Sequence, residues 1–368
     1  MKQRNLGLDI VRSIAIIFVL VSHSRMFFQN YDLQFLSICG LVGVEIFFVL
    51  SGFLIGKIII NELVDNPCMD SLKNFYVRRW FRTLPLYYLV LFLVSFINNQ
   101  SIPHRNYIFM QNFNENALGF LAVSWSLSVE EWFYVLVPAI VILSIKLLGE
   151  KYDKKKIFFI VAILIGITSF MLRFYTVIKY NPTWDYGVRK QVFLRMDAMM
   201  AGVILSGIKI YYNDFYKRIS LSKLPAILSI IGFIGVAYIY ILKLQSGKVF
   251  DMFIWPKIFI FNLISISSMF FILWFETNEL INKSIIKYKI SKVFNFISIT
   301  SYGIYLIHYN IYIMLSAKYQ GITYLAISII LTIILAVVLN KYYEIPIMNF
   351  RDKIKFNRRT TMQTEERV

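Results

Sequence analysis

The chain has 368 residues, of which 58% are hydrophobic and 16% are charged, and its net charge is +18. A soluble domain carries roughly a quarter charged residues, so this composition excludes an ordinary soluble protein and indicates an integral membrane protein. The basic residues are dispersed over separate polar segments, which favours membrane lipid as their partner and argues against nucleic acid.

Ten apolar segments approach or exceed the length that crosses a bilayer as a helix. In chain order they are 6–28, 38–60, 83–99, 120–148, 157–178, 190–212, 224–244, 253–275, 294–316 and 322–343. We therefore expect an all-α fold, a polytopic membrane helix bundle with about ten transmembrane helices. Most Lys and Arg fall on the cytoplasmic side if the N and C termini are both cytoplasmic. Residues 1–350 then form one transmembrane domain, and 351–368 a basic cytoplasmic tail that we expect to be disordered.

The first span contains Arg12 and His23, eleven residues apart, with Asp9 near the same stripe. At about 100° per residue Arg12 and His23 share one helix face, roughly 16 Å apart along the axis. Ionisable side chains inside membrane helices are costly and point into the protein, and a histidine can exchange a proton near neutral pH. His23 is therefore a candidate catalytic residue, although on its own it also fits a hydrogen-bonded histidine at the membrane interface.

Four later spans carry polar side chains at a similar expected depth, in the outer half of the bilayer. These residues are Glu45 in the second span, Ser126 and Glu130 in the fourth, Arg195 and Asp197 in the sixth, and Ser301, Tyr302 and His308 in the ninth. Because ionisable groups that converge usually form a site, we predict that they meet His23 there. The alternatives are a structural ion pair between Arg195 and Asp197 and tyrosines that serve only aromatic packing.

The sequence RRWFR places Arg78, Arg79 and Arg82 at the expected inner end of the third span. Guanidinium groups bind phosphates through paired charge-assisted hydrogen bonds, so these arginines are a candidate phosphate site. The alternative is ordinary anchoring of a span end by basic residues. We expect no metal site, because the three histidines lack ligand spacing, and no disulfide, because Cys39 and Cys68 fall near opposite faces of the membrane.

In order and spacing these motifs resemble those of the membrane acyltransferase family 3, the bacterial ten-helix O-acyltransferases that modify surface sugars. The resemblance covers nearly the whole chain and rests on Arg12 and His23, VGVEIFFVLSGFLI at 42–55, RRWFR at 78–82, WSLSVEEWFY at 125–134, RMD at 195–197, SYGIYLIH at 301–308 and YEIP at 343–346. The family commonly has Asp in place of Glu45 and Gln in place of Trp132. We expect the stand-alone form, without the fused extracytoplasmic hydrolase-like domain of some members.

The resemblance implies an enzyme of the bacterial inner membrane with acyl-CoA, most often acetyl-CoA, as its cytoplasmic donor. The acceptor it implies is a carbohydrate hydroxyl on a cell-surface polysaccharide, lipopolysaccharide or glycolipid precursor. It also implies that the RRWFR arginines contact the CoA phosphates, that His23 is essential, and that Ser126 and Glu130 match the family's SxxxE motif.

Within this scheme His23 is a general base on the acceptor hydroxyl, or first takes the acyl group itself. We assign Glu130 to orient the imidazole, and Tyr302 or Ser301 to donate a hydrogen bond to the developing oxyanion. Arg12 either lies along the acyl-CoA channel or holds Asp9.

A transporter that exports an oligosaccharide or an acylated intermediate is the alternative function, because intramembrane charges and tyrosines also fit that class. Many transporters show repeated halves with broken helices at corresponding positions, and the sequence shows no such repeat. A transporter also leaves RRWFR unexplained.

Overall fold

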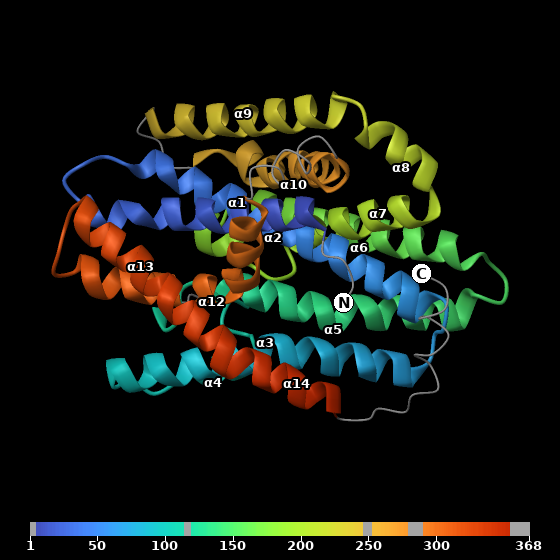
Figure 1. Ribbon diagram of the computed structural model, residues 1–368. Helices are drawn as coiled ribbons and strands as arrows, with labels where there is room; N and C mark the ends of the chain where they lie inside the picture. The colour runs from blue at the N-terminus through green and yellow to red at the C-terminus, as the bar shows by residue number, and fades with distance from the viewer. Residues whose placement is uncertain (1–4, 114–118, 246–251, 279–289, 354–368) are drawn as a thin grey trace.

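The computed structural model describes residues 5–113, 119–245, 252–278 and 290–353, and every regular element within these ranges is helical. The α-helices are α1 (Leu6–Ser24), α2 (Ser37–Ile58), α3 (Met69–Asn98), α4 (His104–Tyr107), α5 (Ser124–Leu148), α6 (Lys154–Tyr180), α7 (Met196–Tyr211), α8 (Asn213–Ser220), α9 (Leu224–Gln245), α10 (Ile254–Thr277), α12 (Ser291–Ser316), α13 (Ile322–Leu339) and α14 (Ile345–Lys353). Short 3₁₀ segments η1 (Arg25–Phe27) and η2 (Gln34–Leu36) and π-helical segments η3 (Ile59–Val64), η5 (Trp184–Arg189) and η7 (Asn340–Glu344) join them. The long helices lie alongside one another (Figure 1), which confirms the predicted all-α bundle.

Eight helical segments in the described ranges are long and apolar enough to cross a membrane, so the chain is a multi-pass membrane protein. The helices α7 and α12 cover the two remaining predicted spans. Helix α7 has only 16 residues. Helix α12 has 26, but it is rich in serine and tyrosine and is not among the eight segments apolar enough to cross. The polar composition of α12 matters below, because this helix lines the site.

Two predicted spans have wrong boundaries. The third was expected to begin at residue 83, but α3 begins at Met69, where the Cys68 sulfur accepts the backbone N–H of Ser71 (3.3 Å). The sequence RRWFR therefore lies within α3 and not at its mouth. The sixth was expected to begin at residue 190, but 190–195 are not helical and α7 starts at Met196. At the other end, α14 runs to Lys353, and the rest of the expected tail, 354–368, lies outside the described residues.

Helices α2 and α7 pack closely because small residues face each other in their contact. A Cβ atom added at Gly52 would lie 1.9 Å from the Met199 carbonyl oxygen, and one at Gly202 would lie 2.0 Å from that of Val49. Small residues at such positions let membrane helices approach until their backbones touch. The contact brings the α2 half that contains Glu45 beside the start of α7.

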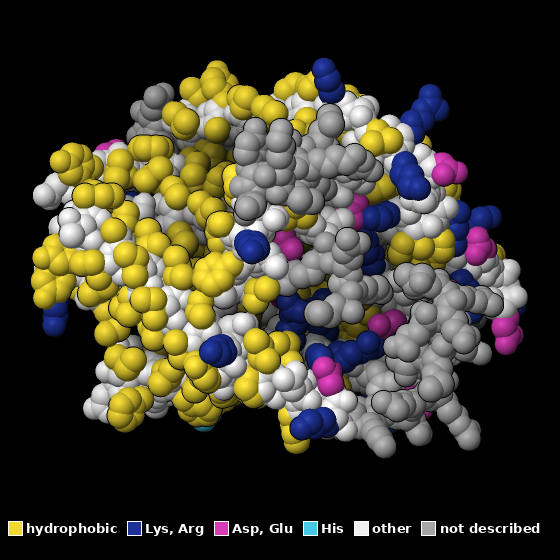
Figure 2. All heavy atoms as spheres, in the orientation of Figure 1, with side chains coloured by type: hydrophobic (Ala, Val, Ile, Leu, Met, Phe, Trp, Pro, Cys, Tyr) yellow, Lys and Arg dark blue, Asp and Glu magenta, His cyan; other side chains and the backbone are white. Residues whose placement is uncertain are grey.

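The outer surface of the bundle is largely apolar. Figure 2 shows hydrophobic side chains over the left and upper parts of the face in view, whereas Lys and Arg gather toward the right. Large apolar side chains on α6, α9 and α13 stay exposed, among them Leu164, Ile231 and Ile330. An apolar band of this extent fits contact with lipid, since soluble proteins rarely expose contiguous apolar patches of more than a few hundred Å².

Candidate active site

A polar cavity of about 260 Å³ lies among α1, α2, α3, α5 and α12, with η7 and α14 completing its wall. Its lining holds three arginines and two glutamates, namely Arg12, Arg79, Arg82, Glu130 and Glu344. The other polar side chains in the wall are Ser51, Thr83, Ser126, Tyr134, Ser298, Ser301, Tyr302, Tyr305 and Asn340. The cavity reaches the protein surface where Arg82 is exposed. Because arginines outnumber glutamates, the wall favours an anionic ligand.

Two of the three RRWFR arginines belong to this cavity. Arg79 and Arg82 line it, whereas Arg78 is exposed, forms an ion pair with Glu62 and accepts a hydrogen bond at its carbonyl oxygen from Arg351 (3.3 Å). The Arg79 guanidinium lies 5.1 Å from the centre of the Tyr134 ring. Its Nε is buried and has no hydrogen-bond partner within the described residues. A buried donor left unsatisfied is costly, so this geometry suits a ligand that supplies an acceptor.

Glu130 is held inside the cavity by two hydroxyl groups. Ser51 Oγ donates to its Oε1 (2.9 Å), and Tyr134 donates its phenolic O–H to Oε2 (3.2 Å). Ser126 lies one turn earlier on α5 and also lines the cavity, where its Oγ is 2.6 Å from the Tyr305 hydroxyl oxygen. The spacing of Ser126 and Glu130 thus places both side chains on the cavity face of α5.

His23 pairs with a second histidine and not with a carboxylate. Its Nδ1 lies 3.0 Å from Nε2 of His308, whose own Nδ1 lies 3.0 Å from the carbonyl oxygen of Ile304. The edge of Tyr309 packs on the His23 ring, with ring centres 5.0 Å apart. The contact expected between Glu130 and His23 is not made, because the two side chains have these separate partners.

The histidine pair lies directly behind one end of the cavity. The Tyr305 ring centre is 5.9 Å from that of His308, and the Tyr305 hydroxyl reaches the cavity wall at Ser126. Farther along α1, Arg12 lines the cavity and donates from Nη1 to Ser298 Oγ (3.3 Å). Of the described residues of α1, Arg12 alone lines the cavity, and His23 and His308 lie behind Tyr305 outside its lining.

Three other predicted residues lie near this wall with their hydrogen bonds satisfied locally. Ser298 Oγ donates to Asp9 Oδ1 (2.6 Å) and so bridges Asp9 to Arg12. Tyr302 donates to the Thr83 carbonyl oxygen (2.6 Å), and Ser301 Oγ to that of Ser298 (2.9 Å). Either of the latter hydroxyls would have to leave its present acceptor before it could donate to an oxyanion.

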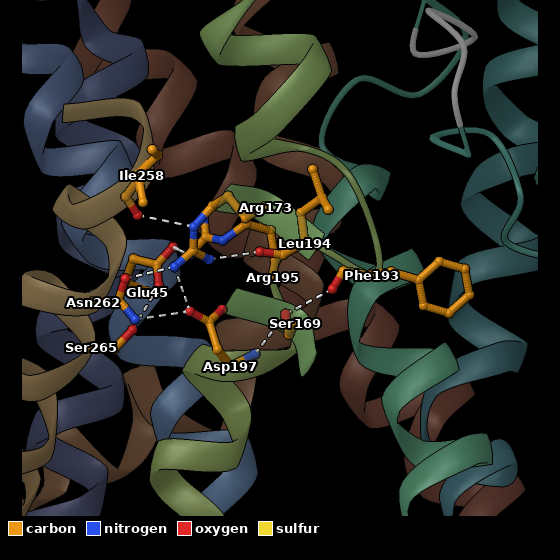
Figure 3. A network of polar contacts seen from close by, with 10 residues as sticks. All are labelled: Glu45, Ser169, Arg173, Phe193, Leu194, Arg195, Asp197, Ile258, Asn262 and Ser265. Carbon is orange, nitrogen blue, oxygen red and sulfur yellow. Dashed lines mark hydrogen bonds and ion pairs between the residues drawn. The ribbon is translucent and has the colours of Figure 1, made fainter. Parts of the chain in front are cut away.

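Glu45, Arg195 and Asp197 do not join His23, contrary to the prediction, but form a separate buried network (Figure 3). Arg195 pairs with Glu45, and Arg173 Nη2 lies 2.8 Å from Asp197 Oδ2. Asn262 accepts from Arg173 Nη2 (2.6 Å) and donates to Asp197 Oδ2 (3.2 Å). The predicted alternative was a direct ion pair between Arg195 and Asp197. Instead, Arg195 pairs with Glu45, and Asp197 pairs with Arg173.

Neutral groups make further contacts with this network, and none of its four charged side chains lines the cavity. Arg195 Nε and Nη1 and Asp197 Oδ1 have no hydrogen-bond partner among the described residues. Arg173 also donates to the carbonyl oxygens of Ile258 (3.0 Å) and Leu194 (2.7 Å). The Arg195 guanidinium lies 3.7 Å from the centre of the Phe261 ring. Arg173 and Arg195 are completely buried, and two carboxylates balance their charge.

Another buried carboxylate, Glu276 at the end of α10, joins the ends of α2 and α7 to α8. It accepts from Lys57 Nζ (3.3 Å), from the Tyr216 hydroxyl (2.8 Å) and from Lys209. Sequence reasoning did not predict this cluster, nor the roles of Tyr305 and Arg173. Arg173 could have been found as a charged residue within an apolar span. Tyr305 could have been found because it lies in the motif SYGIYLIH.

Comparison with known proteins identifies the family. The family model described as an acyltransferase domain matches residues 5–341. The chain belongs to this acyltransferase family. Together with the helical bundle, this membership makes the chain a membrane acyltransferase and confirms the family predicted from the motifs.

Three relatives illustrate the similarity. The chain is 32% identical over 49% of its length to an uncharacterized protein of Haemophilus influenzae, of which it covers 78%. It is 27% identical over 93% of its length to the O-acetyltransferase OatA of Staphylococcus aureus, of which it covers 57%. A putative O-acetyltransferase of Staphylococcus aureus strain COL is 26% identical over 92% of the chain, which covers 56% of that protein. The chain thus spans a little over half the length of these two O-acetyltransferases, and no solved structure matches it.

The described residues include no group of three or more His, Cys, Asp or Glu side chains placed to hold a metal ion. Cys39 and Cys68 are both free thiols.

Proposed function

We propose that the chain is an O-acetyltransferase of a bacterial inner membrane. It moves an acetyl group from cytoplasmic acetyl-CoA to a hydroxyl of a cell-surface polysaccharide or glycolipid precursor. Its family and the printed names of its longer relatives support acetyl transfer. The observation that carries the proposal is one cavity, lined by Arg79 and Arg82 in one part and by Ser126 and Tyr305 in front of the histidine pair.

The cavity volume favours the donor's arm over the whole donor. Pockets for complete small ligands commonly measure roughly 300–1,000 Å³. The cavity here is about 260 Å³, so it suits the extended pantetheine arm and its thioester. The CoA phosphates then stay near the surface opening, where Arg82 and Arg79 provide guanidinium donors. Arg12 and Glu130 line the route of the arm, and the Glu130 carboxylate can accept hydrogen bonds from its amide N–H groups.

The chemistry we propose needs one base near the thioester. The acceptor hydroxyl oxygen attacks the thioester carbonyl carbon while its proton passes to His23. The carbon–sulfur bond breaks, and the proton on His23 then passes to the CoA thiolate, which leaves as the thiol. The products are an acetyl ester of the acceptor and free CoA. If His23 first takes the acetyl group, the same ring nitrogen carries it.

The test is acetyl transfer from radiolabelled acetyl-CoA to glycans in membranes that contain wild-type protein or His23→Ala. We expect the variant to lose at least about 100-fold in rate, the lower range for a general base. The matched control is His104→Ala, because His104 is an exposed residue at the start of α4, far along the chain from either histidine of the pair. Full activity of a normally folded His23→Ala protein would contradict the proposal.

A transporter remains the second candidate function, since its cavity would also be polar. The two functions differ in whether acetyl-CoA is a ligand of the native state. A ligand that binds only folded protein raises its thermal stability in proportion to RT ln(1 + [L]/Kd). We expect acetyl-CoA to raise the Tm of the purified protein, whereas a transporter of oligosaccharides would show no such shift.

A further inference from the structure

The protons in the histidine pair can be assigned from its hydrogen bonds. The Ile304 carbonyl oxygen is only an acceptor, so His308 Nδ1, 3.0 Å away, must carry a hydrogen. A neutral imidazole has one such hydrogen, which leaves His308 Nε2 as an acceptor. His23 Nδ1 lies 3.0 Å from that atom and therefore donates to it. The remaining nitrogen of His23, Nε2, is then unprotonated.

The reverse assignment is unfavourable in this environment. A hydrogen on His308 Nε2 alone would turn its Nδ1 lone pair toward the Ile304 oxygen, and a buried acceptor without a donor costs about 1–3 kcal/mol. A doubly protonated His308 would satisfy both contacts, but it would place a charge on a side chain with 0% exposure. The rings packed around His308 are Tyr305, Tyr309 and Tyr312, which are neutral.

We propose that His308 is a positioning residue, which holds His23 in the tautomer whose Nε2 is free to accept the proton of the acceptor hydroxyl. This inference rests on the proposed function of His23. In many histidine-dependent enzymes a carboxylate holds the imidazole, and its negative charge stabilises the imidazolium. Because His308 is neutral, it fixes the orientation and tautomer of the His23 ring but does not stabilise a second proton on that ring. The proton can then pass readily from His23 to the departing thiolate.

The tautomer itself is measurable without any activity assay. The chain has three histidines, so ¹⁵N-histidine labelling yields three imidazole spin systems, of which exposed His104 is the reference. At about pH 8 an ordinary histidine is neutral, and the ¹⁵N shifts distinguish the two tautomers. Signals are assigned with the His23→Ala and His104→Ala proteins. We expect His23 to be protonated at Nδ1 and not at Nε2. A hydrogen on Nε2 of His23 overturns the proposal.

A pair of variants tests whether His308 acts through this bond. In His308→Gln the side-chain carbonyl takes the place of Nε2 and can still accept from His23. In His308→Asn the amide nitrogen takes the place of Nδ1 and can still donate to Ile304, but the side chain is too short to reach His23. We expect His308→Asn to lower kcat by about 10- to 100-fold, as for other groups that orient a histidine, with little change in KM for acetyl-CoA. His308→Gln should retain kcat within a few-fold of wild type.

The outcomes separate this inference from the proposed function. Equal losses in His308→Gln and His308→Asn mean that His308 only packs, and they overturn its positioning role. If His23→Ala is fully active while the wild-type spectrum shows His23 protonated at Nδ1, the proposed function fails and the tautomer assignment stands. If either His308 variant fails to fold, the wild-type spectrum still decides the assignment.

Discussion

Two of the charged clusters inside this bundle differ in their charge balance and in whether they face open volume. The network of Glu45, Arg173, Arg195 and Asp197 has balanced charges, and neutral partners from α6, α7 and α10 surround it. The cavity group has more arginine than glutamate and adjoins open volume. Arg79 Nε, which has no hydrogen-bond partner among the described residues, belongs to a side chain that lines this cavity, whereas the unpartnered atoms of Arg195 and Asp197 lie away from it.

The difference separates stability from function within one membrane domain. A buried ion pair with balanced charges and no adjoining cavity mainly secures the packing of the helices that carry it. Charges that face a cavity are accessible to a ligand of opposite charge. Position inside the bundle does not distinguish the two groups, because both lie among the packed helices. The distinction depends on charge balance and on whether the charged groups face the cavity, and it yields predictions that can fail.

The largest effect is expected from breaking the network of Glu45, Arg173, Arg195 and Asp197. Arg195→Ala leaves the Glu45 carboxylate, which is 1% exposed, without its cation. Removing one partner of a buried pair typically costs about 3–5 kcal/mol. We expect a large fall in the thermal unfolding temperature of the detergent-purified protein and a poor yield from membranes.

The double variant Glu45→Leu with Arg195→Met is the matched control for this prediction. It removes both charges and keeps apolar volume, so it should recover most of the lost stability and acetyl-transfer activity. A double variant that is as stable as wild type but inactive would show that the network takes part in function. That result would contradict the assignment of the Glu45–Arg195 pair to stability and of the cavity residues to function.

A smaller effect, on binding and not on folding, is expected from the cavity arginines. Arg79→Ala and Arg82→Ala each remove guanidinium donors for a phosphate, and hydrogen bonds to charged groups contribute about 1.5–3 kcal/mol. We expect each change to weaken acetyl-CoA binding by about 10- to 150-fold, measured by calorimetry or by the Tm shift with ligand. The unfolding temperature without ligand should stay near that of wild type.

Arg78→Ala is the control, since this neighbour on α3 is exposed and pairs with Glu62 outside the cavity. An exposed ion pair contributes little, so the change should leave both affinity and stability close to wild type. If Arg78→Ala weakens acetyl-CoA binding as strongly as Arg79→Ala, the ligand approaches from a direction other than this cavity.

The sequence predicted the helices of the bundle, a shared helix face for Ser126 and Glu130, and a common depth for His23 and His308. It predicted the wrong partner for His23 because topology gives the depth of a residue but not which way it faces around its helix axis. The rotation of α5 and α12 follows from tertiary packing, which turns Glu130 toward Ser51 and His308 toward His23. The α2–α7 contact at Gly52 and Gly202 likewise fixes Glu45 beside Arg195. A hydropathy pattern does not show which helices pack against each other, so it could not predict this ion pair.

A third group of charges, outside the spanning helices, should behave like neither of the two. On η5, Asp185 pairs with Arg189 (2.9 Å) and Lys190 (2.5 Å), and its side chain is 35% exposed. Burial alone would raise the pKa of the Asp185 carboxyl, but the two cations outweigh it and hold that pKa below its ordinary value. Because solvent screens this group, we expect Asp185→Asn to cost only about 0.5–1 kcal/mol at pH 7.

The pH dependence of this small effect follows from the direction of the shift. A carboxyl whose pKa is lower in the folded state stabilises the protein above its unfolded pKa, about 3.9, and that stabilisation is lost as the pH falls through the folded value. The unfolding temperatures of wild type and Asp185→Asn should therefore differ at pH 7 and converge below about pH 4. If the two unfolding temperatures still differ at low pH, Asp185 stabilises η5 through hydrogen bonds that do not need its charge.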